Sequence, residues 1–165
     1  MKDNRTHFEA MLLVIAAAIL FSSFHSGEEE KQTTFRTGNM EKKIIFTADA
    51  PAPIGPYSQA VQAGDQLFVS GQIAIDPSNG NLITGDIASE THRVMKNIQA
   101  ILHAAGYDFS YVVKTSIFLT DLNNFSAVNE VYGSYFSSDF PARETVQVAA
   151  LPKNVNLEIS VVAVK

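Results

Sequence analysis

The chain has 165 residues, 46% of them hydrophobic and 18% charged, and a formal net charge of -5 at pH 7. This composition is that of an ordinary globular protein with one domain. From Met40 onward there are eight Lys and Arg against twelve Asp and Glu. No basic stripe is therefore available to neutralise phosphates, and nucleic acid is not an expected partner. Cysteine is absent, which excludes disulfides, thiolate nucleophiles and cysteine metal sites.

Four histidines remain as candidate metal ligands, and their spacing does not favour a metal site. His7 and His25 lie in the N-terminal segment, whereas His92 and His103 are eleven residues apart on one predicted helix, about three turns at 3.6 residues per turn. Because no two of them are close in sequence, we predict no metal site and interpret these side chains as solvent-facing or capping groups.

Residues 1–39 differ in composition from the rest of the chain. Basic residues precede the apolar run Met11–Phe21, and a polar tract follows it. Three interpretations fit: a secretory signal, a transit peptide, or a working start at Met40. The run has eleven residues, too few to span a bilayer comfortably as a helix, so no stable membrane span is expected. We expect an autonomous domain over residues 40–165 and a cytoplasmic protein, with export or an organelle as alternatives if the apolar run acts in targeting.

The predicted domain begins with short strands. The first covers Lys43–Ala48, which is β-branched and apolar, and it ends in a proline-rich turn. The segment Ala60–Ile75 predicts two strands joined by a tight turn at Ala63-Gly64-Asp65. A second turn is expected at Asp76–Asn81 because Pro, Asn and Gly occur together there.

Two amphipathic helices follow, with a strand between them. Apolar residues recur at helical spacing over Ile87–Ala105, and Gly106 is expected to close this helix. The segment Val112–Leu119 is rich in β-branched and aromatic residues, which predicts a buried strand. Phe125–Phe136 predicts the second helix, with one of the two asparagines before it as the N-cap.

Ala142–Val148 and Asn156–Val164 complete the set as two further strands. About six strands and two helices predict an α+β fold, a two-layer sandwich in which both helices cover one face of a mixed sheet. The last strand alternates without making either of its faces fully polar, so the face away from the helices needs a cover. A homo-oligomer that assembles through this open face is therefore expected.

An arginine stands near the start of the strand Ala142–Val148. Strand alternation places Arg143, Thr145 and Gln147 on one face, and Pro141 makes the entry to the strand rigid. The planar guanidinium can bind a carboxylate through two parallel hydrogen bonds, which suits the anchoring of a small anionic substrate. The alternative is a surface or interfacial salt bridge, which is common and contributes little.

Glu158 interrupts the last predicted strand between two apolar residues. If the last two strands pair as a hairpin, Glu158 can lie on the same face as Arg143 and Thr145. It would then form a structural ion pair with Arg143, or act beside a bound substrate by moving protons or orienting water. Ser70 in a polar Ser-Gly-Gln interruption, and Tyr57 on a proline-stiffened loop, are further candidates to line a pocket.

Five segments carry a resemblance to a known family. They are IGPYSQA (Ile54–Ala60), LFVSGQI (Leu67–Ile73), the long segment Val112–Phe136, FPARETVQVAALP (Phe140–Pro152) and NLEISVVAV (Asn156–Val164). Together they resemble the Rid family of reactive intermediate deaminases, especially its RidA branch. The combination of GPYSQA, FPAR and LPK is highly specific. The resemblance covers nearly all of residues 40–165 and none of residues 1–39.

The resemblance implies a chorismate-mutase-like fold, a homotrimer with three clefts between subunits, and no cofactor. It implies that Arg143 holds the substrate carboxylate and that Glu158 takes part in catalysis. Tyr57, Ser70 and Asn129 match substrate-binding positions. Many members carry a cysteine where this chain has Thr145, a departure that removes thiol chemistry but keeps a small hydrogen-bonding group, and Thr145 is therefore kept among the catalytic candidates.

The chemistry implied by the resemblance is the hydrolysis of reactive enamines and imines, such as 2-aminoacrylate and 2-aminocrotonate, to 2-keto acids and ammonia. Such imines hydrolyse spontaneously, so only a modest acceleration is required. The alternative function is that of a non-catalytic, chaperone-like or translation-inhibiting trimer of the endoribonuclease type. The acidic charge balance disfavours the RNA-directed form of this alternative.

Overall fold

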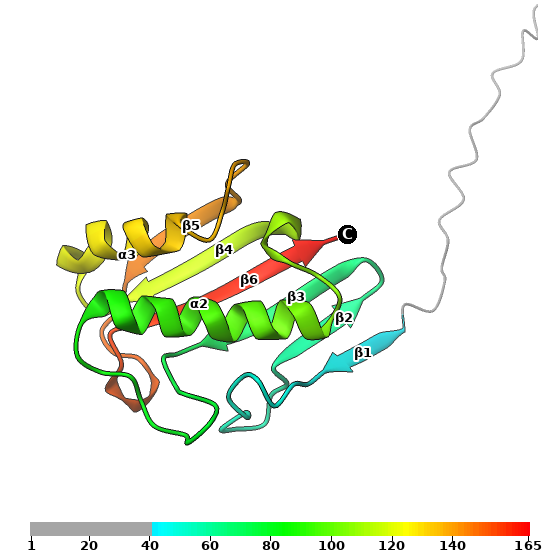
Figure 1. Cartoon of the computed structure of the whole chain (residues 1–165), viewed down its shortest axis with the longest axis horizontal. Helices are drawn as coiled ribbons and strands as arrows, with labels where there is room; N and C mark the ends of the chain where they lie inside the picture. The colour runs from blue at the N-terminus through cyan, green and yellow to red at the C-terminus, as the bar shows by residue number, and fades with distance from the viewer. Residues whose placement is uncertain (1–40) are drawn as a thin grey trace, which may run out of the picture. The chain divides into compact units, whose positions relative to one another are not determined.

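The computed structural model describes residues 41–165, so the interpretations given for residues 1–39 concern a segment outside the described residues. Residues 41–165 lie within one compact unit. Six strands make one sheet in the order β1-β2-β3-β6-β4-β5 (Figure 1). The strands are β1 Lys42–Ile45, β2 Ala60–Ala63, β3 Gln66–Gln72, β4 Val112–Leu119, β5 Ala142–Gln147 and β6 Leu157–Val164. All neighbours are antiparallel except β4 and β5, which are parallel.

Helices α2 (Ile87–Ala104) and α3 (Phe125–Gly133) both lie over one face of this sheet (Figure 1). The predicted fold class, a six-stranded mixed sheet with two helices on one face, is therefore confirmed. The side chain of Asp86 caps the start of α2 by accepting a hydrogen bond from the backbone of Ser89, 2.9 Å away. Gly106 follows the helix with a φ of 80°, a left-handed conformation that glycine adopts without a steric penalty.

Helix α3 is shorter than the sequence predicts, because it ends at Gly133 and not at Phe136. At its start Asn124 occupies the N-cap position, as predicted for one of the two asparagines, but its side chain makes no capping hydrogen bond. A short 3-10 helix, Leu122–Asn124, precedes α3 and is capped by the side chain of Asp121. Beyond Gly133 the backbone is no longer helical, although the side chains of Tyr135 and Phe136 still pack on the core.

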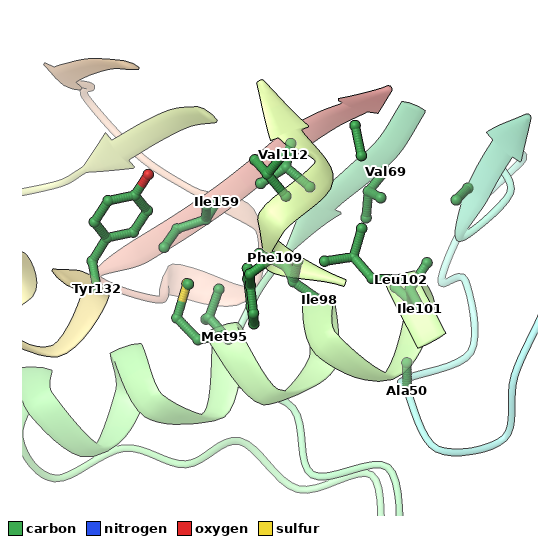
Figure 2. Packing of buried hydrophobic residues seen from close by; sticks show 14 of the residues in the cluster. Ala50, Val69, Met95, Ile98, Ile101, Leu102, Phe109, Val112, Tyr132 and Ile159 are labelled. Carbon is green, nitrogen blue, oxygen red and sulfur yellow. The ribbon is translucent and has the colours of Figure 1, made fainter. Parts of the chain in front are cut away.

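The core lies between the sheet and the two helices. In Figure 2, Met95 and Ile98 of α2 lie beneath Val112 and Ile159 of the sheet region. Along β6 every second residue from Leu157 is buried, while the residues between them are half-buried. This alternation assigns one face of the strand to the helices and the other to the open side of the sheet.

The connection between the last two strands differs from the prediction. β5 and β6 do not form a hairpin, because β4 lies between them. β5 instead pairs with β4 in parallel after the crossover through α3, which is the arrangement that a strand, helix, strand unit adopts. Neither helix of residues 41–165 has the length and apolar character needed to cross a membrane.

Candidate functional site

Arg143 and Thr145 lie on the helix-covered face of the sheet. Arg143 is opposite Thr115 of β4 and Thr145 is opposite Ile117, and both β4 partners are buried beneath the helices. The guanidinium carbon of Arg143 lies 5.0 Å from the centre of the Tyr132 ring on α3. The predicted alternation along this strand is confirmed, because Glu144 contacts Lys114 and Ser116 through its side chain on the opposite face.

Glu158 lies on the open face, which corrects the predicted placement beside Arg143. Its neighbours Leu157 and Ile159 are fully buried on the helix side, so the side chain between them points the other way. In the register of the sheet Glu158 is opposite Phe118. Within one chain, Arg143 and Glu158 are therefore separated by the sheet and form no ion pair.

Apart from Thr145, which lines neither hollow, the predicted site residues divide into two groups, which we call half-site 1 and half-site 2. Half-site 1 is a hollow of about 240 Å³ that contains three predicted residues, Tyr57, Ser70 and Glu158. Ile54, Gly71, Ile73 and Pro152 complete its lining. Half-site 2 is a hollow of about 420 Å³ that contains Asn129 and Arg143, together with Tyr132, Gly133, Phe140 and Pro141.

The carboxyl group of Glu158 occupies space that only a glycine at position 71 leaves open. A Cβ atom on Gly71 would overlap Glu158 Oε1 and lie 2.7 Å from its Cδ. The pairing of β3 with β6 shifts register between Val69 and Gln72, as at a β-bulge. Burial raises the pKa of Glu158 above its usual range. A larger share of this group therefore keeps its proton near neutral pH than of an exposed glutamate.

Buried polar side chains hold the walls of half-site 1. The amide nitrogen of Gln59 donates to the carbonyl oxygens of Thr47, Ala50 and Pro51 at 2.9 to 3.1 Å, which fixes the loop before Tyr57. The hydroxyl of Ser70 donates to the Ser58 carbonyl at 2.7 Å. Because that bond uses the only hydroxyl proton, Ser70 can serve a ligand as an acceptor and not as a donor.

The hydroxyl of Tyr57 accepts one hydrogen bond and donates none within the described part of the chain. The backbone N–H of Ile54 donates to the Tyr57 oxygen over 3.2 Å, and the hydrogen bonds of residues 41–165 give its own proton no acceptor. The side chain is about half exposed and lines the hollow with Glu158. Tyr57 can therefore donate a hydrogen bond to a ligand in half-site 1.

The guanidinium of Arg143 is exposed and has no acidic partner in the described part of the chain. The salt bridge found there joins Lys114 and Glu144 instead. Its neighbours are the aromatic rings of Tyr132 and Phe125, at 5.0 and 5.9 Å from the guanidinium carbon to each ring centre. Aromatic faces attract a cation without occupying its N–H groups in the plane. The group is therefore free to bind a carboxylate.

Two further polar atoms near Arg143 lack partners. Asn129 Oδ1 and Thr145 Oγ1 are buried and make no hydrogen bond with any described residue. Buried polar atoms in native proteins are nearly always hydrogen-bonded, so the lack of a partner at these two atoms needs a structural or functional reason. Asn129 lines half-site 2 directly, and its oxygen can accept a hydrogen bond from a bound molecule. Among residues 41–165, no group of three or more His, Asp or Glu is placed to hold a metal ion.

Comparison with known proteins identifies the family of the chain. The family profile described as endoribonuclease L-PSP matches residues 47–165. The chain belongs to this family. Human 2-iminobutanoate/2-iminopropanoate deaminase is 52% identical over 124 residues, which are 75% of this chain and 90% of the human protein.

Solved structures of the L-PSP family have the same fold. A Rid family protein of unknown function from Yersinia pestis matches with a TM-score of 0.74 and 48% identity over 76% of this chain and all of its own. E. coli TdcF with bound serine matches with a TM-score of 0.72 and 43% identity, covering 74% of this chain and 98% of TdcF. The predicted resemblance to the Rid family is thus confirmed.

Sequence reasoning named the polar residues of this L-PSP family member but missed most of the apolar walls. Ile54, Ile73 and Pro152 around half-site 1 gave no separate signal, although all three lie within segments that carried the resemblance. Tyr132 and Phe140 around half-site 2 were assigned only to a helix face and a motif. The pattern FPAR places Phe140 next to Pro141, which was a usable signal for the wall beside Arg143.

Proposed function

We propose that the chain hydrolyses 2-iminobutanoate and 2-iminopropanoate to 2-keto acids and ammonia. The observation that carries this function is the exposed Arg143 guanidinium, which has aromatic neighbours and no acidic partner among residues 41–165. Relatives named as 2-iminobutanoate/2-iminopropanoate deaminases are about half identical over three quarters of the chain, from human, bovine and mouse sources. The chain is an enzyme that acts on C=N bonds.

We further propose that the working site joins half-site 1 of one subunit to half-site 2 of another. The two halves lie on opposite faces of one sheet, so a single chain cannot bring Arg143 and Glu158 to one substrate. The open face also carries exposed apolar side chains: Ile44, Phe68 and Val146 are 51, 45 and 41% exposed. Covering them against other copies would bury apolar area and create clefts between subunits. A homotrimer with three such clefts is the assembly we propose.

In this cleft Arg143 binds the carboxylate of the substrate through two parallel hydrogen bonds. This contact orients the adjacent imine carbon and removes part of the entropic barrier. The substrates are small 2-imino acids and the products are 2-keto acids. The bound serine of E. coli TdcF is a molecule of this size with a carboxylate.

Glu158 serves as the proton-transferring group. Its raised pKa leaves a fraction of the carboxyl protonated, able to donate to the imine nitrogen, and the remainder ionised, able to accept a proton from water. Water adds to the carbon, the C–N bond breaks, and ammonia leaves as the C=O bond forms. Asn129 and Thr145 present acceptor oxygens, Tyr57 presents a hydroxyl proton, and Ser70 presents an acceptor. No step requires a cofactor.

An RNA-directed function of the endoribonuclease type is the second candidate, and charge weighs against it. The part of the chain that forms the domain has eight basic residues against twelve acidic ones. A phosphate footprint would need clustered Lys and Arg and would weaken steeply with salt. The proposed compartment is the cytoplasm; export or an organelle would apply if the segment Met11–Phe21, outside the described residues, acts in targeting.

The proposed function is tested by replacing Arg143. The Arg143→Ala variant should lose about 100-fold or more in kcat/KM for imine hydrolysis, measured with imine released by a threonine or serine dehydratase, because the carboxylate anchor is gone. Arg93→Ala, at a partly exposed arginine of α2 outside both half-sites, is the matched control and should keep full activity. Unchanged turnover in Arg143→Ala with the assembly intact would refute the assignment.

A further inference from the structure

Glu90 is a buried carboxylate that belongs to neither half-site. It lies in the first turn of α2 and is 1% exposed. Burial of a carboxylate is costly unless hydrogen bonds replace its water. A negative group in the first turn of a helix is also favoured by the helix dipole. The identity of its partners therefore indicates what this residue does.

The Glu90 carboxylate accepts three hydrogen bonds, all from Asn156, just before β6, and Leu157, its first residue. The backbone N–H of Asn156 donates to Oε1 at 2.8 Å, and that of Leu157 donates to the same oxygen at 3.2 Å. The side-chain amide of Asn156 donates to Oε2 at 2.9 Å. The Asn156 carbonyl in turn accepts from the backbone N–H of Thr120 at 3.1 Å, after the end of β4.

This clamp lies one residue before Glu158. The side-chain carboxyl of Glu158 has no hydrogen bond or ion pair with the rest of residues 41–165, so its position depends on the backbone from which it projects. Glu90 fixes that backbone from the helix side of the sheet, and Glu158 emerges on the open side. The register shift beside Gly71 then provides the space that the carboxyl occupies.

We propose that Glu90 is a positioning residue for the deaminase reaction, which holds the start of β6 so that Glu158 projects into half-site 1. The inference rests on the proposed function and deepens it. Glu90 does not touch the substrate, because it lines neither hollow. Its effect is transmitted through the backbone of Asn156 and Leu157.

A positioning role of Glu90 can be distinguished from a general structural role because substrate binding and proton transfer depend on different residues. The substrate carboxylate is anchored by Arg143 in half-site 2, which the Glu90 clamp does not contact. Loss of the clamp should therefore lower kcat, which depends on Glu158, and leave KM nearly unchanged. A residue that only stabilised the fold would lower the melting temperature and leave kcat unchanged in the molecules that remain folded.

Two substitutions of Glu90 test this. Glu90→Met keeps the length of the side chain and removes all acceptors. Glu90→Gln keeps one acceptor for the two backbone N–H groups, and its amide can bond Asn156 once the Asn156 amide turns over. Glu90→Met should lose about tenfold or more in kcat with KM within about twofold, because a displacement of about 1 Å is enough for such a loss. Glu90→Gln should recover activity to within about threefold of the wild type.

The matched control is Glu130→Met, the same change at an exposed glutamate of α3, which should leave kcat unchanged. Hydrogen exchange of the Leu157 amide gives a second readout: its protection should fall in Glu90→Met and persist in Glu90→Gln and Glu130→Met. If Glu90→Met does not fold, Asn156→Ala, which removes only the side-chain donor, should show a smaller fall in kcat at constant KM.

A lower melting temperature with an unchanged kcat in Glu90→Met, or in Asn156→Ala where it takes its place, would overturn the positioning role. A failure of the proposed function looks different: wild type and Arg143→Ala would then hydrolyse the imine equally poorly. In that case the exchange of the Leu157 amide still decides whether Glu90 fixes the start of β6, and unchanged protection in Glu90→Met would overturn the clamp itself.

Discussion

Two glutamates on the open face of the sheet have pKa shifts of opposite sign. Burial raises the pKa of Glu158. The hydrogen bond from Lys114, followed by that from Ser116, lowers the pKa of Glu144. Both start from an ordinary value of 4.5. The two residues therefore link stability to pH in opposite directions, which makes each the control for the other.

Between the unfolded-state pKa of 4.5 and the higher folded-state pKa, the Glu158 carboxyl binds more protons in the folded protein than in the unfolded chain. The contribution of Glu158 to the free energy of unfolding therefore falls as pH rises through this window. Glu158→Gln should accordingly gain melting temperature relative to the wild type as pH rises from about 4 to 8, while it loses hydrolysis. Thermal unfolding at several pH values and one protein concentration measures this. A difference that stays constant or shrinks with rising pH would contradict it.

Glu144 should behave in the opposite way. Its lowered pKa contributes stability above pH 4.5, and that contribution is lost as pH falls through the folded-state pKa. Glu144→Gln should therefore lower the melting temperature at neutral pH, with a difference from the wild type that fades in acid. The same series of unfolding scans provides the test, and a loss that persists equally at low pH would show that packing and not charge is responsible.

Most residues of the candidate site could be named from the sequence, but their grouping could not. Arg143 stood out as a cation at a rigid strand start, and Glu158 as a charge inside an apolar strand. Strand alternation gives the face of each residue only within its own strand. Relating Arg143 to Glu158 requires the strand order, in which β4 lies between β5 and β6. Each β5 residue pairs with a β4 residue 28 positions earlier in the chain, as Arg143 does with Thr115, and alternation within one strand does not reveal such a pairing.

At the level of elements, the bulge in β3 links the sheet to the chemistry. Gly71 interrupts the regular pairing with β6 and leaves room for the Glu158 carboxyl. Gly71→Ala should preserve the fold, because the overlapping atoms belong to the flexible end of a side chain. It should lower kcat/KM by about 10- to 100-fold, because the carboxyl is displaced by about an ångström.

Gly85→Ala is the matched control for this change. Apart from Gly85 and its two chain neighbours, no described atom lies within 4 Å of the position that its Cβ would occupy, so the substitution should leave kcat/KM unchanged. Steady-state hydrolysis of a dehydratase-released imine by both variants checks the pair. Full activity in Gly71→Ala would show that the carboxyl of Glu158 does not need this position.

The elements themselves were predicted best where hydrophobic pattern and local turn chemistry agree. Val112–Leu119 has the predicted bounds, and α2 ends one residue before the predicted Ala105. Helix α3 was predicted three residues too long because Tyr135 and Phe136 continue the apolar pattern after the backbone has left the helix. Periodicity reports burial, and these aromatic rings stay packed on Phe109 without helical backbone.

The two half-sites give the whole molecule a property that no single chain has. Each subunit would offer the proton-transferring carboxyl to one neighbour and the carboxylate-binding guanidinium to the other. In a closed ring of three, every site then takes one half from each of two different subunits. A defect in half-site 1 and a defect in half-site 2 should therefore complement each other when they lie on different chains.

Mixing the Arg143→Ala and Glu158→Gln variants tests this arrangement. Each homotrimer lacks one half of every site and should be inactive. After the chains are unfolded and refolded together at equal concentration, each mixed trimer has one complete site, so about one quarter of wild-type activity should return if subunits combine at random. Refolding each variant alone is the control. If hydrolysis does not return although mass measurement shows mixed trimers, Arg143 and Glu158 do not meet across subunits, and the shared cleft must be abandoned.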